Sequence, residues 1–175
     1  FGTLIAVIFY FRKELKEIIK NLNLLEKNNL GLNLLIATLP IAIAGYMSKD
    51  FIEINLRSED VIFWTTLTFG LVLIFSNKLS ADHKNLNQIS LRDSLLIGSF
   101  QVFALIPGSS RSAVTMIAAL LLGYTKFDAA KFSFLLAVPT LFLVFTSELV
   151  DLSQESTNIS YFNLTYVASI SFLSA

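Results

Sequence analysis

The sequence lacks cysteine and contains one histidine, His83. Without thiols the chain cannot form disulfides, zinc–thiolate centres or cysteine nucleophiles. A single imidazole also excludes a site with several histidine ligands within this chain. Charge is scarce: Asp, Glu, Lys and Arg make up 15% of the 175 residues, and the net charge is zero. A soluble domain is usually about 25% charged, and this balance gives no overall attraction to nucleic acid.

The scarcity of charge is accompanied by an excess of apolar residues. They make up 54% of the chain, and the mean hydropathy is +0.67. A soluble fold of this size cannot bury so much apolar surface, so we expect lipid to be the solvent. Apolar sequence begins at Phe1 without a preceding basic stretch, unlike a signal peptide. It ends inside another apolar run, 166–175, and we expect both ends to be cut from a longer protein.

Apolar stretches separated by short polar ones predict an all-α integral membrane protein, a multi-span helical bundle in a single membrane domain, 1–175. The stretches are 4–11, 32–47, 61–75, 94–106, 113–124, 132–150 and 162–175. A full span needs roughly 20 residues, and the two that flank Pro107-Gly108 are shorter. They predict half-helices in a re-entrant hairpin at about 94–124. The alternative, one helix through this break, would bury Arg111 in mid-membrane at a cost of several kcal/mol by most estimates.

The charges of the loops agree with the hairpin. Basic residues dominate 12–27, 78–92 and 126–131, which the positive-inside rule assigns to the cytoplasm. Segments 49–60 and 148–160 are balanced or acidic and are assigned to the outside. All five assignments agree only if residues 94–124 enter and leave the membrane on the cytoplasmic side.

An internal similarity predicts inverted-topology repeats. Phe1–Phe11 aligns with Phe132–Phe142 through coincident Phe, Leu, Ala, Val and Phe residues. Residues 1–76 would then be the remainder of a first repeat and residues 93–175 the second. Such repeats with broken helices place a site near the midplane. A chance match between apolar segments is the alternative.

The segment from Gln101 to Ser112 carries the candidate site. Pro107 and Gly108 end the first half-helix, and Ser109 or Ser110 is a natural N-cap for the second. Unpaired N–H groups and the helix dipole favour an anion there, and Arg111 can bind phosphate oxygens through two hydrogen bonds. The alternative is structural: Arg111 pairs with a distant carboxylate, and the serines cap or pack.

The same residues resemble a known family. Gln101, Ala104–Ser112, Leu122-Gly123 and Phe132–Pro139 are similar to the second signature region of the undecaprenyl-diphosphate phosphatase (bacitracin-resistance) family. Ser109 stands where that family often has Thr, and Ala113 where it usually has Gly. Its other signature, with paired glutamates, a Ser-rich stretch and a His, is not found in this sequence.

The resemblance implies an enzyme of the bacterial inner membrane that hydrolyses undecaprenyl diphosphate to the monophosphate. This reaction recycles the lipid carrier for peptidoglycan synthesis and confers bacitracin resistance. The resemblance also implies a divalent cation, Mg²⁺ or Ca²⁺, with its ligands among the glutamates that this chain lacks; a homo-oligomer is left open. It implies catalytic roles for Arg111, Ser110 and Ser112, and substrate binding by Ser109, Gly108 and Gln101.

Two other functions compete with the enzyme. A transporter or flippase for an anionic lipid phosphate would also use inverted repeats, broken helices and a midplane anion site. A structural membrane subunit would account for the spans but gives no reason for the serine–arginine cluster 109–112. Phosphate release distinguishes the enzyme from the transporter.

Overall fold

A computed structural model describes residues 2–20 and 29–154, and their regular secondary structure is entirely helical. This confirms the expected all-α membrane fold. The α-helices are α1 (Gly2–Tyr10), α2 (Arg12–Lys20), α3 (Leu30–Asn55), α4 (Glu59–Leu79), α5 (Leu91–Gln101), α6 (Arg111–Leu121) and α7 (Lys126–Gln154). Two 3₁₀ turns, η1 (Leu86–Gln88) and η2 (Val102–Leu105), flank α5.

Three helices in the described part of the chain are long and apolar enough to cross a membrane. They are Leu30–Lys49, Glu59–Leu79 and Lys126–Ser147, in the stretches where the sequence predicts full spans. Helices α5 and α6 have 11 residues each. At 1.5 Å per residue each is about 16 Å long, roughly half the hydrocarbon thickness of a bilayer.

The predicted loops are partly helical. Helix α3 continues to Asn55 and α7 to Gln154, so segments 49–60 and 148–160 both begin as helix. The basic segment after Phe11 forms α2, in which Leu15 and Ile18 pack against the core while the lysines are exposed. Apolar residues three apart lie on one face of a helix, a pattern that loop charge alone does not reveal. The predicted last span, 162–175, lies outside the described residues.

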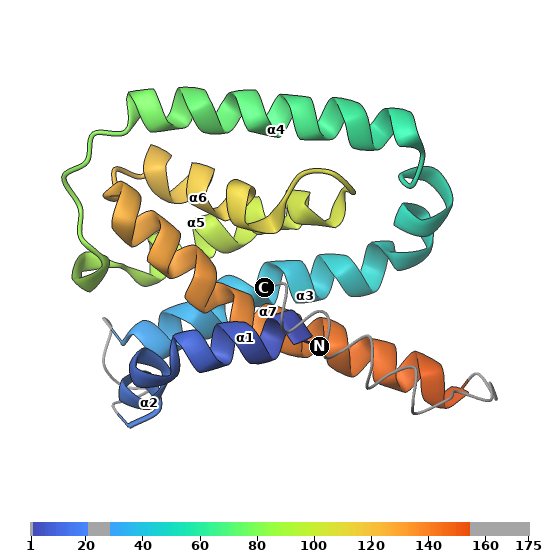
Figure 1. Ribbon diagram of the computed structural model, residues 1–175, viewed down its shortest axis with the longest axis horizontal. Helices are drawn as coiled ribbons and strands as arrows, with labels where there is room; N and C mark the ends of the chain where they lie inside the picture. Colours follow the sequence, from blue (N-terminus) through green and yellow to red (C-terminus); the bar gives the residue numbers. More distant parts are fainter. Residues whose placement is uncertain (1, 21–28, 155–175) are drawn as a thin grey trace.

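The α5–α6 hairpin lies between two sets of helices. Figure 1 shows α4 along one side of it, against α6, and α3 on the opposite side, packed against α5 and α7. Helices α3 and α5 come very close, because a Cβ added to Gly98 would lie 2.3 Å from the carbonyl oxygen of Ala37. At the same crossing the Ser94 hydroxyl donates to Oδ1 of Asn33 over 2.9 Å. Small residues and interhelical hydrogen bonds of this kind associate helices within lipid.

Hydrogen bonds hold the end of the hairpin beside the end of α4, and the Tyr124 hydroxyl holds the beginning of the hairpin there by donating to Asp93 in the first turn of α5. The Ser80 hydroxyl donates to the Tyr124 carbonyl over 3.3 Å. The amides of His83 and Lys84 donate to the Gly123 carbonyl over 3.1 and 2.9 Å. The turn of the hairpin lies elsewhere on α4, where the Thr66 hydroxyl donates to the Gly108 carbonyl over 3.0 Å.

The hairpin therefore enters and leaves on the same side. Thr66 precedes Ser80 by about four helical turns, or about 21 Å along α4. The turn thus lies deep in the layer spanned by α4, nearer to the Glu59 end than to the Lys78 end. This arrangement matches the re-entrant hairpin expected at about 94–124.

Helix α4 presents an apolar outer surface. Of its side chains, all of which the structure describes, only Ser76 is buried. Phe63, Trp64 and Phe75 are each about 60% exposed. Apolar patches of this extent are rare on soluble monomers, and they suit a helix that faces lipid or other membrane helices.

The segments of the predicted repeat lie in α1 and α7, which pack against each other. Helix α1 runs toward α2, whereas α7 starts next to the end of α6 and runs away from that side (Figure 1). The two segments are therefore antiparallel, as inverted repeats require. The repeat and its boundaries, 1–76 and 93–175, stay predictions.

Candidate anion site at the hairpin tip

The hairpin tip, residues 106–112, is a tight turn closed by Ser109. The Ser109 amide and hydroxyl both donate to the Ile106 carbonyl, over 3.3 and 2.8 Å. The side chain is 1% exposed. Ser109 was predicted to bind substrate, but its hydroxyl proton is used inside the turn, which favours a role in shaping the tip.

Gly108 lets the tip contact α4. Its φ is +92°, a conformation that side chains rarely adopt. A Cβ there would lie 2.6 Å from the Ile62 carbonyl oxygen and 2.8 Å from the Thr66 hydroxyl. Glycine is thus needed for the turn and for the close approach. Through its backbone, the predicted substrate-binding residue Gly108 sets where the tip sits.

Ser110 occupies the N-cap position of α6 without capping it. Its φ of 56° and ψ of 107° lie far from the extended backbone of a capping residue, and its side chain makes no capping hydrogen bond. The predicted position was right and the predicted capping bond was wrong. The exposed hydroxyl lies instead 3.4 Å from the Ser112 hydroxyl.

The start of α6 consequently keeps donors available. The first backbone bond of the helix runs from the Val114 amide to the Ser110 carbonyl over 3.0 Å. The preceding amides, of Arg111, Ser112 and Ala113, have no carbonyl within the helix to bond. Together with the dipole, these amides and the hydroxyls of Ser110 and Ser112 favour an anion at this end of α6.

Arg111 is partly buried and forms no salt bridge with any side chain that the structure describes. The structural alternative, in which a distant carboxylate neutralises Arg111, is thus not met among the described side chains. A guanidinium is costly at membrane depth unless an anion accompanies it. The described tip therefore combines an unneutralised cation, two hydroxyls and free amides.

Gln101 lies within the bundle and away from the exposed surface. It is fully buried, and its Nε2 donates to the Thr140 hydroxyl on α7 over 2.8 Å. Its Oε1 has no hydrogen-bond partner among the described residues. Gln101 was predicted to bind substrate, but this side chain ties the hairpin to α7.

A second contact between the hairpin and α7, made by hydroxyl groups, was not predicted from the sequence. The hydroxyls of Thr115 and Ser133 are 2.6 Å apart, and the Ser133 hydroxyl donates to the Ser112 carbonyl over 3.3 Å. These contacts hold the first turn of α6, and Arg111 with it, against α7. The presence of hydroxyl residues inside two apolar helices could have indicated such a contact. Which hydroxyls pair with each other depends on how the helices pack.

The described residues do not fit a divalent cation. They contain no group of three His, Cys, Asp or Glu side chains that could hold a metal ion. The tip instead offers a guanidinium, which repels a cation. Hard divalent cations take carboxylate and carbonyl oxygens as ligands, so no step of the chemistry is assigned to a metal here.

Three helices long enough to span a membrane and a re-entrant hairpin with a cationic tip define a polytopic membrane protein with a candidate anion site. The chain belongs to the family described as "Bacitracin resistance protein BacA", whose profile matches residues 1–175. The family resemblance inferred from the serine–arginine motif is therefore confirmed.

Curated relatives match over most of the chain. It is 40% identical over 181 residues to undecaprenyl-diphosphatase 1 of Pseudoalteromonas translucida (strain TAC 125), covering 99% of this chain and 68% of the relative. It is 44% identical over 149 residues to undecaprenyl-diphosphatase of Teredinibacter turnerae (81% and 56%). It is 37% identical over 174 residues to undecaprenyl-diphosphatase of Pelagibacter ubique (98% and 65%). The matches thus span between 56% and 68% of these relatives' lengths.

Proposed function

We propose that the protein containing this chain hydrolyses undecaprenyl diphosphate to undecaprenyl phosphate and inorganic phosphate. The observation that carries the proposal is Arg111, a guanidinium with no ion-pair partner in the described residues, at the start of a membrane half-helix. Relatives at 37–44% identity are named undecaprenyl-diphosphatase. The reaction would recycle the lipid carrier for peptidoglycan synthesis in the bacterial inner membrane, and thereby give bacitracin resistance.

The tip would act on the diphosphate through charge and hydrogen bonding. Arg111 would bind oxygens of the phosphoryl group being transferred and stabilise the charge that develops on it. The hydroxyls of Ser110 and Ser112 and the free amides of α6 would donate to the remaining oxygens. Fixed donors act most strongly where water is excluded, which suits a tip held at depth against α4. Ser109 and Gly108 would shape the turn, and Gln101 would hold it to α7.

We further propose that the reaction requires Mg²⁺ or Ca²⁺, bound by ligands outside the described residues. The chemistry of phosphoryl transfer supports this, because metal ions neutralise charge on the transferred group. Chelation of divalent cations from the full-length protein should abolish phosphate release, and adding back either ion should restore it. Full activity in excess chelator would remove the cation from the proposal.

Phosphate release from a polyprenyl diphosphate by the full-length protein in detergent tests the function. Arg111→Ala should reduce the rate by at least about a hundredfold, the scale of losing one transition-state donor. Arg92→Ala is the matched control, because Arg92 is an exposed arginine at the other end of the hairpin. Equal activity in the two variants would reduce Arg111 to a structural charge.

A transporter of an anionic lipid phosphate is the second candidate, favoured by the broken helix within a membrane bundle. If the wild-type protein moves lipid phosphate between leaflets and releases no phosphate, with or without Mg²⁺, the transporter replaces the enzyme.

A further inference from the structure

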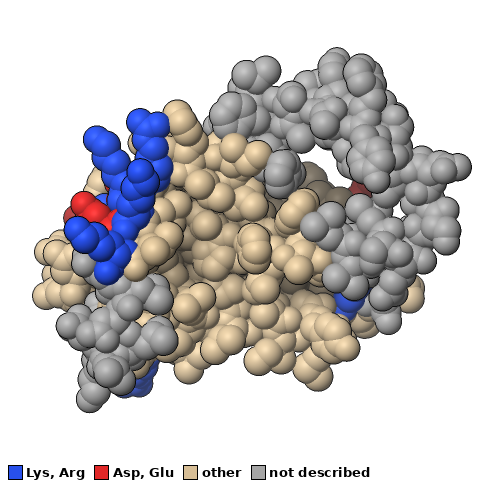
Figure 2. Space-filling model, turned by 90° about the horizontal axis from the view of Figure 1, so that it is seen from below, with Lys and Arg blue, Asp and Glu red and all other residues tan. Residues whose placement is uncertain are grey.

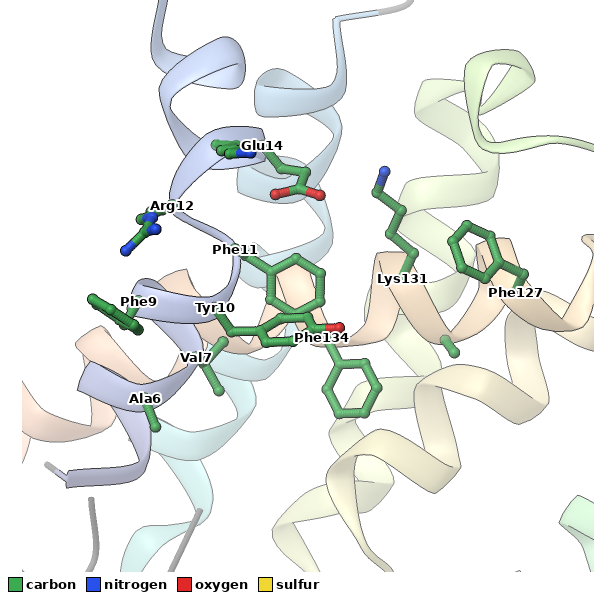
Figure 3. A pocket seen from close by; sticks show the side chains of 12 residues that line it. Ala6, Val7, Phe9, Tyr10, Phe11, Arg12, Glu14, Phe127, Lys131 and Phe134 are labelled. Carbon is green, nitrogen blue, oxygen red and sulfur yellow. The ribbon is translucent and has the colours of Figure 1, made fainter. Parts of the chain in front are cut away.

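A groove of about 1060 Å³ lies between the α1–α2 corner and the first turns of α7 (Figure 3). It lies on the side where the hairpin begins and ends, because α7 starts directly after Tyr124. The hairpin tip lies at the other end of α6. The groove is thus separate from the candidate anion site, and its occupant does not depend on the proposed function.

The floor of the groove is aromatic. Phe11 and Phe134 stack with ring centroids 6.2 Å apart. Phe9, Phe134 and Phe127 are 60%, 44% and 74% exposed. Apolar surface of this kind, open at a membrane boundary, favours contact with a hydrocarbon chain over contact with water.

The rim of the groove is basic. Arg12 and Lys13 come from α2, and Lys131 comes from α7, more than a hundred residues later in the chain. The Arg12 guanidinium lies over the Phe9 ring, 4.6 Å from its centroid. Glu14 is the single acidic residue of the lining; its carboxylate and the Lys131 ammonium both point into the groove (Figure 3). Within the described ranges no salt bridge joins them, so three cations stand against one carboxylate.

The composition of α2 suits a helix at a lipid surface. Its apolar residues Leu15 and Ile18 pack against the core, while Arg12, Lys13, Lys16 and Lys20 are exposed. Figure 2 shows Lys and Arg side chains gathered at the end of the molecule where α2 lies. A short amphipathic helix with a basic polar face lies in the membrane interface and attracts anionic lipids.

We propose that the groove binds an anionic phospholipid. Its phosphate would lie against Lys13 and Lys131, with Arg12 at the outer rim over Phe9, and an acyl chain would cover Phe11 and Phe134. The charge of the rim selects an anionic headgroup over a zwitterionic one, and the aromatic floor selects a lipid over a free anion. Bound there, the lipid would join α2 to α7 at the exit of the hairpin.

Native mass spectrometry of the full-length protein, titrated with phosphatidylglycerol or phosphatidylcholine, tests the selectivity. The double variant Lys13→Gln, Lys131→Gln should weaken phosphatidylglycerol binding by about tenfold or more, since each cation near a lipid surface contributes appreciably. The matched control Lys78→Gln, Arg92→Gln removes two exposed charges from the same side outside the groove. Equal losses in both double variants, or no preference for phosphatidylglycerol in the wild type, would overturn the proposal.

A photo-crosslinking residue in place of Phe127 tests the occupant directly. Phe127 is exposed on the groove wall, so the replacement should leave the fold intact. Ultraviolet light should attach phosphatidylglycerol in a membrane that contains it. A crosslink to another segment of the protein or to a second copy would show that protein covers the groove, and the lipid proposal would fail.

Discussion

The tip and the base of the hairpin contain similar residues, but these residues have opposite roles. Each has a glycine at positive φ, Gly108 at 92° and Gly123 at 90°, and each has a cation and hydroxyl groups. At the hairpin base, residues 84, 93 and 123–125, the Lys84 ammonium lies 3.5 Å from the Asp93 carboxylate. The Tyr124 hydroxyl donates to that same carboxylate over 2.7 Å. At the tip, Arg111 has no carboxylate partner among the described residues.

The paired groups of the base stabilise the fold, whereas the unpaired groups of the tip can bind a ligand. A polar network whose members are all paired rigidifies a structure, and the partly buried base joins three helix ends in this way. A cation left without a partner lowers stability but attracts an anionic ligand. The positive φ of Ser110, a non-glycine residue, fits the general finding that backbone strain gathers at functional sites.

Placing a carboxylate beside Arg111 should make the tip less cationic and closer to the base. Ser112→Asp should reduce phosphate release by about a hundredfold or more, because the new charge offsets that of Arg111 and repels the diphosphate. Thermal stability should stay level or rise, since an acidic residue in the first turn of a helix is favourable. Ser112→Asn is the neutral control of the same shape. Equal activity in the two variants would refute a charge-based role for the tip.

The two glycines should differ in their tolerance of alanine. Both substitutions force a side chain into positive φ at roughly 1 kcal/mol. At Gly108 the added carbon also meets the Ile62 backbone, whereas at Gly123 it meets the His83 ring, which can move. We expect Gly108→Ala to lower the free energy of unfolding by about 2–3 kcal/mol and Gly123→Ala by about 1 kcal/mol. Thermal melting in detergent measures both losses of stability. A larger loss for Gly123→Ala than for Gly108→Ala would show that α4 moves aside for the added carbon at the tip.

Removing the Asp93 carboxylate should destabilise the hairpin base without affecting the tip. Asp93→Asn deprives Lys84 of its partner and weakens the acceptor for Tyr124, which we expect to cost about 1–2 kcal/mol because the pair is only partly buried. Activity per folded molecule should be unchanged. Asp82→Asn, in the exposed loop before the base, is the control. A loss of activity in Asp93→Asn without loss of stability would couple the base to the site.

Alkaline pH should loosen the base before the tip. Burial, and then the hydrogen bond and charge of Asp93, raise the pKa of the Tyr124 phenol above its ordinary 10.0. The folded state therefore holds this proton more tightly than the unfolded state does. Its contribution is complete below about pH 10 and is lost as pH rises above that value. Melting temperatures between about pH 9 and 11 should fall less steeply for Tyr124→Phe than for the wild type, and parallel curves would contradict this linkage.

Much of the architecture could be predicted from local sequence. The spans 32–47, 61–75 and 132–150 and the half-helices beside Pro107-Gly108 follow from run length alone. That the hairpin begins and ends on one side agrees with where lysine and arginine gather. These features depend on the free energy of transferring a segment from water to lipid. That free energy is set largely by the composition of the segment itself.

The details of the site could not be predicted in the same way. Helix α2 was missed because its charge pattern also suits a loop. The capping bond of Ser110 was wrong because contact with α4 sets the backbone of the turn. The directions of Gln101 and Ser109 depend on α7 and on the turn, neither of which follows from their neighbours in sequence.

The sequence by itself determined that this chain is a membrane protein, where its spans and half-helices fall, and which segment carries the candidate phosphate-binding groups. Its unbroken apolar runs, its Pro-Gly break and the side-chain chemistry of Ser109–Ser112 are local properties that survive any packing. The tertiary structure alone decided which of those groups remain free. It closed Ser109 into the turn, paired Gln101 with Thr140 and left Arg111 without a carboxylate among the described residues, because contacts between distant helices determine which polar groups find partners.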